Sequence, residues 1–230
     1  MKFIIVGMGN FGAYLAARLT DKGHEVIGID NDMNKIEAVK EKVTHTICMN
    51  ATDKHAVKNL PIKETDVVLI AIGEDMGASI MATAVFKELQ AKRIISRAIT
   101  NTHETVIKAI GVDEIIHPEE ETAERLSKKL EMKGVIDSFD ISDGYNIVEV
   151  TAPKDFVGKT IGETAVRNRF NVNILTIIKV RNRANLFGNL QERQKVLGVV
   201  NAQTMIEKND ILVLFGDIKD IQNILNLNEE

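Results

Sequence analysis

Six residues near the start of the chain have the types and spacing needed to bind a phosphate group. They follow a short apolar segment and precede a helical pattern, and they are Gly7, Met8, Gly9, Asn10, Phe11 and Gly12. In a G-x-G-x-x-G turn of this kind, the first glycine permits the tight bend and the second lets the backbone approach a pyrophosphate. The third lets helix and strand pack closely, and the free N–H groups of the helix face the phosphates. We therefore expect a nucleotide site here rather than a turn that binds nothing.

A carboxylate further along the chain supports this interpretation. Asp30 follows a predicted strand over 24–29 and lies eighteen residues after Gly12. An acid at this place can accept hydrogen bonds from an adenosine ribose. No Arg or Lys comes directly after it, since Asn31 and Asp32 follow, so a 2′-phosphate would be repelled.

Further candidate residues follow the later strands, because ligands of a doubly wound sheet bind beyond the carboxyl ends of its strands. Small residues there would let an adenine ring lie against the backbone, and a glycine would open room near the ribose. An arginine at the end of the fifth strand would reach a phosphate, although a surface ion pair explains it equally well. Together with the glycine turn and Asp30, the candidate residues are Asn31, Ala51, Thr52, Ala71, Ile72, Gly73 and Arg97.

The elements that must position these residues alternate between strand and helix patterns over 1–134. Strands are predicted over 1–6, 24–29, 45–49, 66–72, 93–97 and 113–116. Helices are predicted over 10–22, 32–42, 53–59, 75–89, 102–110 and 119–132. Six strands joined by helices indicate an α/β fold, a Rossmann-like doubly wound parallel sheet.

The pattern changes near Gly134, after a polar helix that would connect two domains. Strands are predicted over 137–142, 145–152, 173–180, 195–200 and 210–215, and helices over 160–170 and 218–227. The polar stretch 181–194 is expected to be a loop or a contact surface. We therefore expect a first domain over 1–134 and a small α+β domain over 135–230.

Composition and charge narrow the class of protein. The net charge of −4 gives no electrostatic reason to bind nucleic acid. No apolar run approaches the roughly 18 residues of a membrane span. Because the first predicted strand begins at Met1, we expect no signal peptide. The single cysteine, Cys48, excludes an intramolecular disulfide and fits a reducing cytoplasm. Its apolar neighbours predict a buried thiol.

The residues expected of a dehydrogenase are missing. All five histidines lie in the first domain, and the second has no His, no Cys and a single Tyr, Tyr145. A hydride-transferring enzyme needs a group that donates or accepts a proton beside the hydride. We therefore interpret the nucleotide as a sensed ligand, and keep a small NAD-dependent oxidoreductase as the alternative.

Several segments together carry a resemblance to a known family. In the first domain they are Phe3–Gly12, Val26–Asp30, Asn50–Thr52 and Ile115–Glu119, and in the second Phe156–Glu163 and Lys208–Gly216. In order and spacing they resemble the RCK (KTN) domains of the TrkA/KtrA type, regulators of potassium channels and transporters. The C-terminal part resembles the RCK-C (TrkA-C) domain.

The resemblance implies a cytosolic gating subunit with no enzymatic role. Such proteins form homodimers that assemble into octameric rings beneath a membrane-embedded potassium-translocating subunit of the TrkH/KtrB type. Binding of ATP, ADP or NAD(H) changes the shape of the ring and so gates ion flow. The chain would then be cytoplasmic, held at the inner face of the membrane by its partner, without inserting into the bilayer.

The resemblance also assigns roles to two single residues. Glu119 matches a family acid associated with a cation, Mg or Ca, at the dimer interface. On the sequence alone it could face the pocket mouth or a bound cation, but a cap of the connector helix is favoured, where its charge suits the helix dipole. Asn10 stands where many ATP-responsive members carry Arg. Because Asn cannot neutralise a phosphate, this favours NAD(H), or an adenine site that does not discriminate ATP from ADP.

A second ligand is suggested by relatives whose RCK-C domains bind cyclic di-AMP between two copies. Ile161, Arg167 and Ile174 match the place of that pocket. The alternative reading makes the two isoleucines ordinary core residues and Arg167 a solvated charge.

Overall fold

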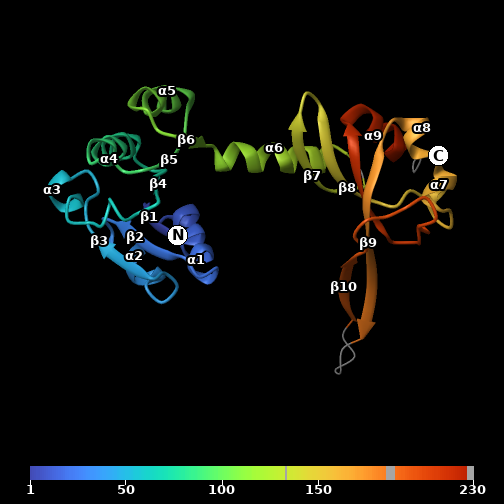
Figure 1. The fold of residues 1–230 in the computed structure, drawn as a ribbon, viewed down its shortest axis with the longest axis horizontal. Helices are drawn as coiled ribbons and strands as arrows, with labels where there is room; N and C mark the ends of the chain where they lie inside the picture. Colours follow the sequence, from blue (N-terminus) through green and yellow to red (C-terminus); the bar gives the residue numbers. More distant parts are fainter. Residues whose placement is uncertain (133, 185–189, 227–230) are drawn as a thin grey trace. The chain divides into compact units, whose positions relative to one another are not determined.

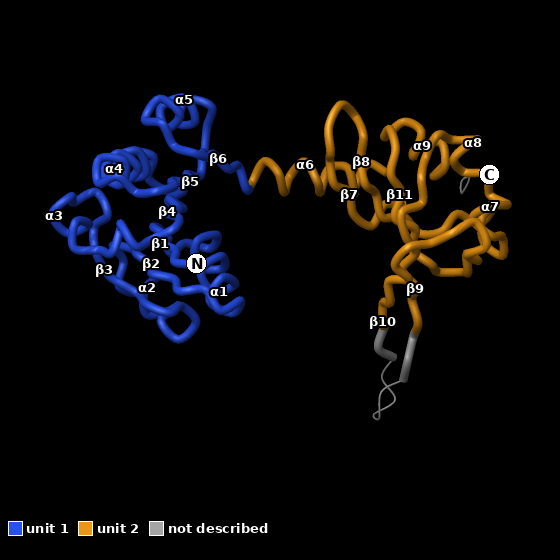
Figure 2. Tube along the Cα trace, viewed as in Figure 1, with its two compact units in different colours: residues 1–118 blue, residues 119–230 orange. Residues whose placement is uncertain are grey.

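The computed structural model describes residues 1–132, 134–184 and 190–226 of the chain. Its contacts divide the chain into two compact units, residues 1–118 and 119–230, and each is described by itself (Figure 2). Within the described residues, no helix combines the length and the apolar character needed to cross a bilayer.

Unit 1 is built on a six-stranded parallel sheet with the order β3-β2-β1-β4-β5-β6 (Figure 1). Its strands are β1 (Lys2–Val6), β2 (Glu25–Asp30), β3 (His45–Cys48), β4 (Val67–Ile70), β5 (Ile94–Arg97) and β6 (Glu114–Ile116). Its helices are α1 (Asn10–Asp21), α2 (Met33–Val39), α3 (Lys54–Val57), α4 (Met76–Glu88) and α5 (Asn101–Ile110). The strand order reverses beside β1, which pairs with β2 and with β4. The predicted Rossmann-like doubly wound fold is confirmed.

Neighbouring residues of β1 enter separate cores on the two faces of this sheet. Ile4 belongs to the cluster that contains Phe86 of α4, and Ile5 to the cluster that contains Ala16 of α1. Covering both faces explains why the strands read as continuous apolar runs. Each fully buried isoleucine contributes about 1.5–3 kcal/mol to stability, and this holds the end of β1 firmly in place.

Unit 2 combines the helix α6 (Pro118–Glu131) with a five-stranded antiparallel sheet of order β10-β9-β11-β8-β7. The strands are β7 (Val135–Ser142), β8 (Tyr145–Thr151), β9 (Asn173–Ala184), β10 (Leu190–Val196) and β11 (Ile211–Asp217). The helical segments are η1 (Lys154–Phe156), α7 (Ile161–Thr164), α8 (Val166–Phe170) and α9 (Ile218–Asn226). The core includes Val148, Leu212, Leu214 and Ile221, each 0% exposed. The expected small α+β fold is confirmed.

The single helix expected over 160–170 is two short helices. Ala165 lies in the left-handed region, with φ of 48° and ψ of 31°, where α7 ends and α8 begins. At the start of α7, the side chains of Thr160 and Glu163 form a reciprocal capping box. The backbone N–H of Thr160 donates to the Glu163 carboxylate, which lowers the pKa of Glu163. The break follows from packing, because Val166 directly after it enters the core.

The polar stretch 181–194 is mostly strand, so the expectation of a loop is wrong there. β9 continues to Ala184 and β10 begins at Leu190, while 185–189 lie outside the described residues. The strand predicted over 195–200 also ends early, since β10 stops at Val196 and Gly198 has φ of 80°. The interpretation of this stretch as a contact surface stays a prediction.

Helix α6 groups with the second unit by contact. The guanidinium of Arg125 donates to Asp137 of β7, with Nε 2.6 Å from Oδ1, and this hydrogen bond lowers the pKa of Asp137. Lys128 pairs with Asp140 of the same strand. The division between compact units therefore lies before α6, whereas the domain boundary predicted from the sequence, between 1–134 and 135–230, lies after it.

The expectation of a buried thiol at Cys48 is wrong, because this residue is exposed. β3 is an edge strand of the sheet and Cys48 is its last residue. Its Sγ atom lies 3.6 Å from the carbonyl oxygen of Asn31.

Candidate functional site

The glycine turn packs tightly onto the end of β4. Gly7 has φ of 100°, and a Cβ atom there would lie 2.9 Å from the backbone nitrogen of Ile72. A Cβ atom on Gly12 would lie 1.9 Å from the carbonyl oxygen of Gly7 and 3.1 Å from Cβ of Ala71. Both positions therefore require glycine for the fold itself, and the predicted roles of Gly7 in the bend and Gly12 in close packing are confirmed.

Gly9 differs from the other two glycines. Its φ of −69° is open to any residue, and a Cβ atom there would meet no other described atom within 4 Å. Gly9 is also the N-cap of α1, a place where Ser, Asp or Asn would stabilise the helix. Neither backbone strain nor crowding within the chain explains a glycine here.

The start of α1 is left without the side-chain caps that the other helices of unit 1 have. In the described part of the chain no side chain caps α1, and its first turn has no acidic residue. The four following helices each begin with a capping side chain, and these caps are Asp32, Asp53, Asp75 and Thr100. The first N–H groups of any helix have no partner inside it, so those of α1 are available to an anion.

Asp30 is at the end of β2, as predicted, and its carboxylate is bound by two backbone groups. Oδ2 accepts from the N–H of Met8 at 2.7 Å, and Oδ1 accepts from the N–H of Asp32 at 2.9 Å. The residue is only 8% exposed. Each oxygen keeps one further acceptor site, which a ribose hydroxyl would use. The structural role of Asp30 in fixing the glycine turn was not foreseen from the sequence.

The side chains of Met8 and Phe11 pack in the same hydrophobic core, to different depths. Met8 is buried and its Sδ atom lies over Gly28 of β2, so only its backbone faces the turn. The ring of Phe11 is half-buried, and its centroid lies 6.0 Å from Cζ of Arg97. Arg97 thus reaches from the end of β5 to the first turn of α1.

The room expected beside the ribose at Gly73 is taken by an arginine. A Cβ atom on Gly73 would lie 2.4 Å from a guanidinium nitrogen of Arg97. The glycine therefore lets this cation lie against the segment that follows β4. This arrangement brings Arg97, Gly73 and Phe11 together.

The remaining predicted residues lie at the same edge of the sheet with mixed exposure. Ala51 and Ala71 are buried, so their methyl groups belong to the cores. Thr52 is half-buried, and both its N–H and its hydroxyl donate to Oδ1 of Asn50. Ile72 is half-buried and Asn31 is exposed.

Sequence reasoning missed an ion pair that joins two segments of this edge. Nζ of Lys35 in α2 lies 3.3 Å from Oε2 of Glu74, the residue directly after Gly73. The pair links the segment after β2 to the segment after β4. No motif in the sequence marks it, because the two residues are distant along the chain.

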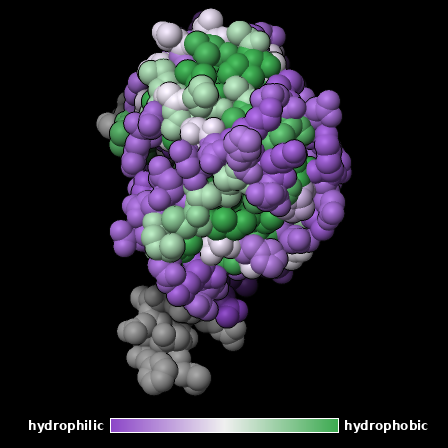
Figure 3. Space-filling model, turned by 90° about the vertical axis from the view of Figure 1, so that its left-hand side faces the viewer, coloured by the Kyte–Doolittle hydropathy of each residue, from purple (hydrophilic) through white to green (hydrophobic). Residues whose placement is uncertain are grey.

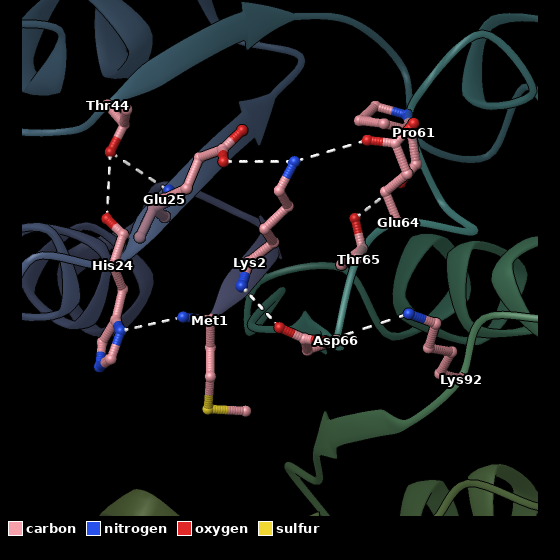
Figure 4. A network of polar contacts seen from close by, with 11 residues as sticks. Met1, Lys2, His24, Glu25, Thr44, Pro61, Glu64, Thr65, Asp66 and Lys92 are labelled. Carbon is pink, nitrogen blue, oxygen red and sulfur yellow. Dashed lines mark hydrogen bonds and ion pairs between the residues drawn. The ribbon is translucent and has the colours of Figure 1, made fainter.

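Polar groups at the opposite edge, where the strands begin, bind one another (Figure 4). The N–H of Lys2 donates to Asp66 at 2.8 Å, and its Nζ lies 3.4 Å from Oε2 of Glu25. The hydroxyl of Thr44 accepts from the N–H of Val26 and donates to the carbonyl of His24. The uncapped start of α1 lies at the other edge of the sheet, beyond the carboxyl ends of the strands, where ligands of this fold bind.

The other predicted ligand residues lie in unit 2. Glu119 is exposed in the first turn of α6, and the described residues hold no group of three His, Cys, Asp or Glu arranged for a metal ion. Ile161 and Ile174 are half-buried and pack against the core of unit 2. Arg167 is exposed, and its Nε donates to Oδ1 of Asn173 at 2.8 Å. The predicted roles of all four residues stay predictions.

Comparison with known protein families assigns both parts of the chain. Residues 3–118 match the TrkA-N domain, and residues 147–228 match the TrkA-C domain. The chain is 30% identical over 220 residues to the Ktr system potassium uptake protein C of Bacillus subtilis, covering 96% of this chain and 94% of that protein. It is also 30% identical over 225 residues to the Ktr system potassium uptake protein A of the same organism, covering 98% and 96%.

Solved structures share the fold at lower identity. The RCK domain of GsuK matches with a TM-score of 0.64 and 17% identity, over 100% of this chain and 48% of that one. The GsuK channel bound to NAD matches with a TM-score of 0.62 and 17% identity, over 100% of this chain and 39% of that one. The chain thus spans half or less of those structures.

Proposed function

Because this chain belongs to the TrkA/Ktr family of potassium-uptake proteins, with a TrkA-N and a TrkA-C domain, we propose that it is a nucleotide-sensing gating subunit. Its first domain binds an adenine nucleotide or NAD(H), and the bound state controls potassium flow through a membrane-embedded subunit. The chain would lie on the cytoplasmic side of the membrane, held there by that partner.

The observation that carries the proposal is Gly9 at the uncapped start of α1. A glycine that the fold does not need, at a helix start with free N–H groups, is explained by a ligand that must approach the backbone. The ligand is an anion, because those N–H groups and the positive end of the helix dipole face it. Arg97 lies beside the same turn, with its guanidinium carbon 6.0 Å from the centroid of the Phe11 ring.

Of the candidate nucleotides, NAD(H) fits these residues best. Asn10 adds no charge to the turn, at the position where many ATP-responsive relatives carry Arg. Asp30, Asn31 and Asp32 follow one another at the ribose end and would repel a 2′-phosphate. The similar fold of the GsuK channel bound to NAD is consistent with this choice.

Gating requires two arrangements of the assembled protein that bind the nucleotide unequally. Tenfold discrimination corresponds to about 1.4 kcal/mol per site, and the effect multiplies over the proposed homodimers and octameric ring. Exposed apolar side chains support self-association. Leu126 and Leu130 of α6 are 51% and 77% exposed, and Leu126 lines a groove of about 740 Å³ between α6 and β7.

Unit 1 also exposes apolar side chains that an assembly would cover. Figure 3 shows apolar areas among hydrophilic ones on one face of the molecule. Exposed apolar residues of α4 and α5 include Met81 and Val106, at 54% and 37%. We propose that Glu119 binds Mg or Ca at the dimer interface. We also propose that Ile161, Arg167 and Ile174 contact cyclic di-AMP between two copies.

The direct test is potassium flux through the membrane subunit that copurifies with the chain. That subunit is reconstituted in vesicles with and without the chain, in the presence of NAD⁺, NADH, ATP or ADP. Flux that responds to a nucleotide only when the chain is present supports the proposal. Flux indifferent to the chain contradicts it, and a stoichiometric change in nicotinamide absorbance with a substrate would favour the alternative, an NAD-dependent oxidoreductase.

A further inference from the structure

Strands β9 and β10 extend past the rest of their sheet. β11 pairs with β9 only as far as Ile178, whereas β9 continues to Ala184, paired within the described residues only with β10. Figure 1 shows these two strands projecting from unit 2. We call residues 179–184 and 190–196 the arm. A two-stranded ribbon without a third strand is marginally stable in water, so the arm contributes little to the stability of unit 2.

The arm is strongly basic in a chain of net negative charge. Between residues 179 and 196 the sequence has five Lys or Arg and one Glu. The strand register places Arg193 opposite Arg181 and Lys195 opposite Lys179. Side chains directly opposite, and those two apart on one strand, share a face. These four cations therefore lie on one face of the arm.

One of the four cations is neutralised within unit 2. Nζ of Lys179 lies 2.8 Å from Asp210 and 3.3 Å from Glu207. Arg181, Arg193 and Lys195 are exposed, and among the described residues none of them has an acidic partner. Like charges directly opposite each other destabilise a strand pair. Such an arrangement is stabilised by an external anionic surface.

Exposed aliphatic side chains continue directly from these cations. Val196 is 58% exposed, Leu197 39% and Val199 99%. Cations beside exposed aliphatic groups match the surface of an anionic bilayer, where headgroups pair with the cations and the acyl boundary accepts the apolar groups. A nucleic acid would pair with the cations but leave the aliphatic groups in water.

We propose that the arm binds the surface of an anionic lipid bilayer through Arg181, Arg193 and Lys195, with Val199 in shallow contact. This inference rests on the proposed function only in placing the chain beside a membrane. This contact is peripheral, and it adds to the attachment to the membrane that the membrane-embedded partner provides.

The test is cosedimentation of the full chain with vesicles of phosphatidylcholine alone and of phosphatidylcholine mixed with phosphatidylglycerol. The wild type should bind only the anionic vesicles, and more weakly as salt rises. Replacing the three cations (Arg181→Gln, Arg193→Gln and Lys195→Gln together) should weaken binding about 100-fold, since each cation near an anionic surface changes binding about fivefold. Val199→Ser should weaken it a few-fold.

A matched control changes three exposed cations of unit 1 (Lys22→Gln, Lys42→Gln and Lys58→Gln together), with the same change in net charge. It should bind anionic vesicles as the wild type does. Equal binding by the arm variant and the wild type overturns the proposal, as does binding of the wild type to heparin but not to vesicles. The thermal shift caused by NADH is measured in the wild type and in the arm variant. If the arm variant keeps this shift, its nucleotide site is intact and the loss of vesicle binding is due to the arm.

Discussion

The backbone N–H of Met8 donates to Oδ2 of Asp30 at 2.7 Å, and this hydrogen bond joins the glycine turn to the end of β2. The second oxygen of Asp30 holds the N–H of Asp32, the cap of α2. One buried carboxylate therefore fixes both segments between which a nucleotide would lie. A ligand that binds Asp30 would act on the turn and on α2 together.

The substitution Asp30→Asn tests this dual role. The amide can accept one of the two backbone hydrogen bonds but presents an N–H₂ group to the other donor, so stability should fall by about 1.5–3 kcal/mol. The response to NADH should also weaken. Urea unfolding and thermal shift with NADH measure the two effects. The control Asp53→Asn, at the cap of α3, should stay within about 0.5 kcal/mol of the wild type.

His103 makes the stability of unit 1 dependent on pH. The residue is 0% exposed, neither ring nitrogen has a hydrogen-bond partner among the described residues, and burial lowers the pKa of its imidazole. Below the unfolded pKa of about 6.5 the unfolded chain binds a proton that the folded one resists, so stability falls as pH falls. The limiting slope is about 1.4 kcal/mol per pH unit.

His103→Leu should remove that acid sensitivity, as measured by urea unfolding between pH 5 and 7.5. His55→Leu, at an exposed position of α3, is the matched control and should keep the slope of the wild type. An unchanged slope in His103→Leu would show that other groups govern the acid response.

The buried ion pair of unit 2 should be costly to break. Lys179 and Asp210 have side chains only 11% and 3% exposed, and Asp210 also accepts the N–H of Glu207 at 2.7 Å. Lys179→Met leaves the carboxylate without its cation and should destabilise unit 2 by about 3–5 kcal/mol. Lys208→Met, exposed near the same turn, should change stability by less than about 0.5 kcal/mol. Equal effects of the two changes in denaturant melts would contradict this.

Asn10→Arg should shift the preference of the site toward ATP. The new cation at the start of α1 would neutralise a terminal phosphate, while the helix dipole makes it unfavourable by about 0.3–1 kcal/mol without a ligand. We expect lower stability of the free protein and tighter binding of ATP relative to NADH, both measured by calorimetry. Asn168→Arg, on α8, supplies the same charge far along the chain and should change neither.

The sequence was sufficient to predict the strand–turn–helix unit and its place in the fold. Gly7 and Gly12 are required by crowding that any chain of this fold meets, so their spacing is diagnostic. The apolar runs of the six strands mark a sheet covered on both faces, and the order reversal beside β1 follows from that fold. Asp30 could be placed at the end of its strand for the same reason.

Features that depend on tertiary contact could not be predicted. The left-handed backbone at Ala165 occurs at a residue other than glycine, so no local sequence signal marks the break between α7 and α8. The position of β3 at the sheet edge exposes Cys48, although its neighbours along the chain are apolar. The contact of Arg97 with Gly73 joins the end of β5 to the segment after β4, so no local pattern contains it.

The most direct test of the central claim is calorimetric titration of NADH into the wild type and into Gly9→Ala. Because Gly9 has φ of −69° and open space around its Cβ position, alanine should lower stability only by the roughly 1 kcal/mol by which it is a poorer N-cap than glycine. It should weaken NADH binding about tenfold or more, a loss of at least ~1.4 kcal/mol, because the methyl group blocks the approach of the pyrophosphate. Two results would contradict the account. One is NADH binding that is as strong in Gly9→Ala as in the wild type, and the other is a wild type that binds none of NADH, ATP and ADP.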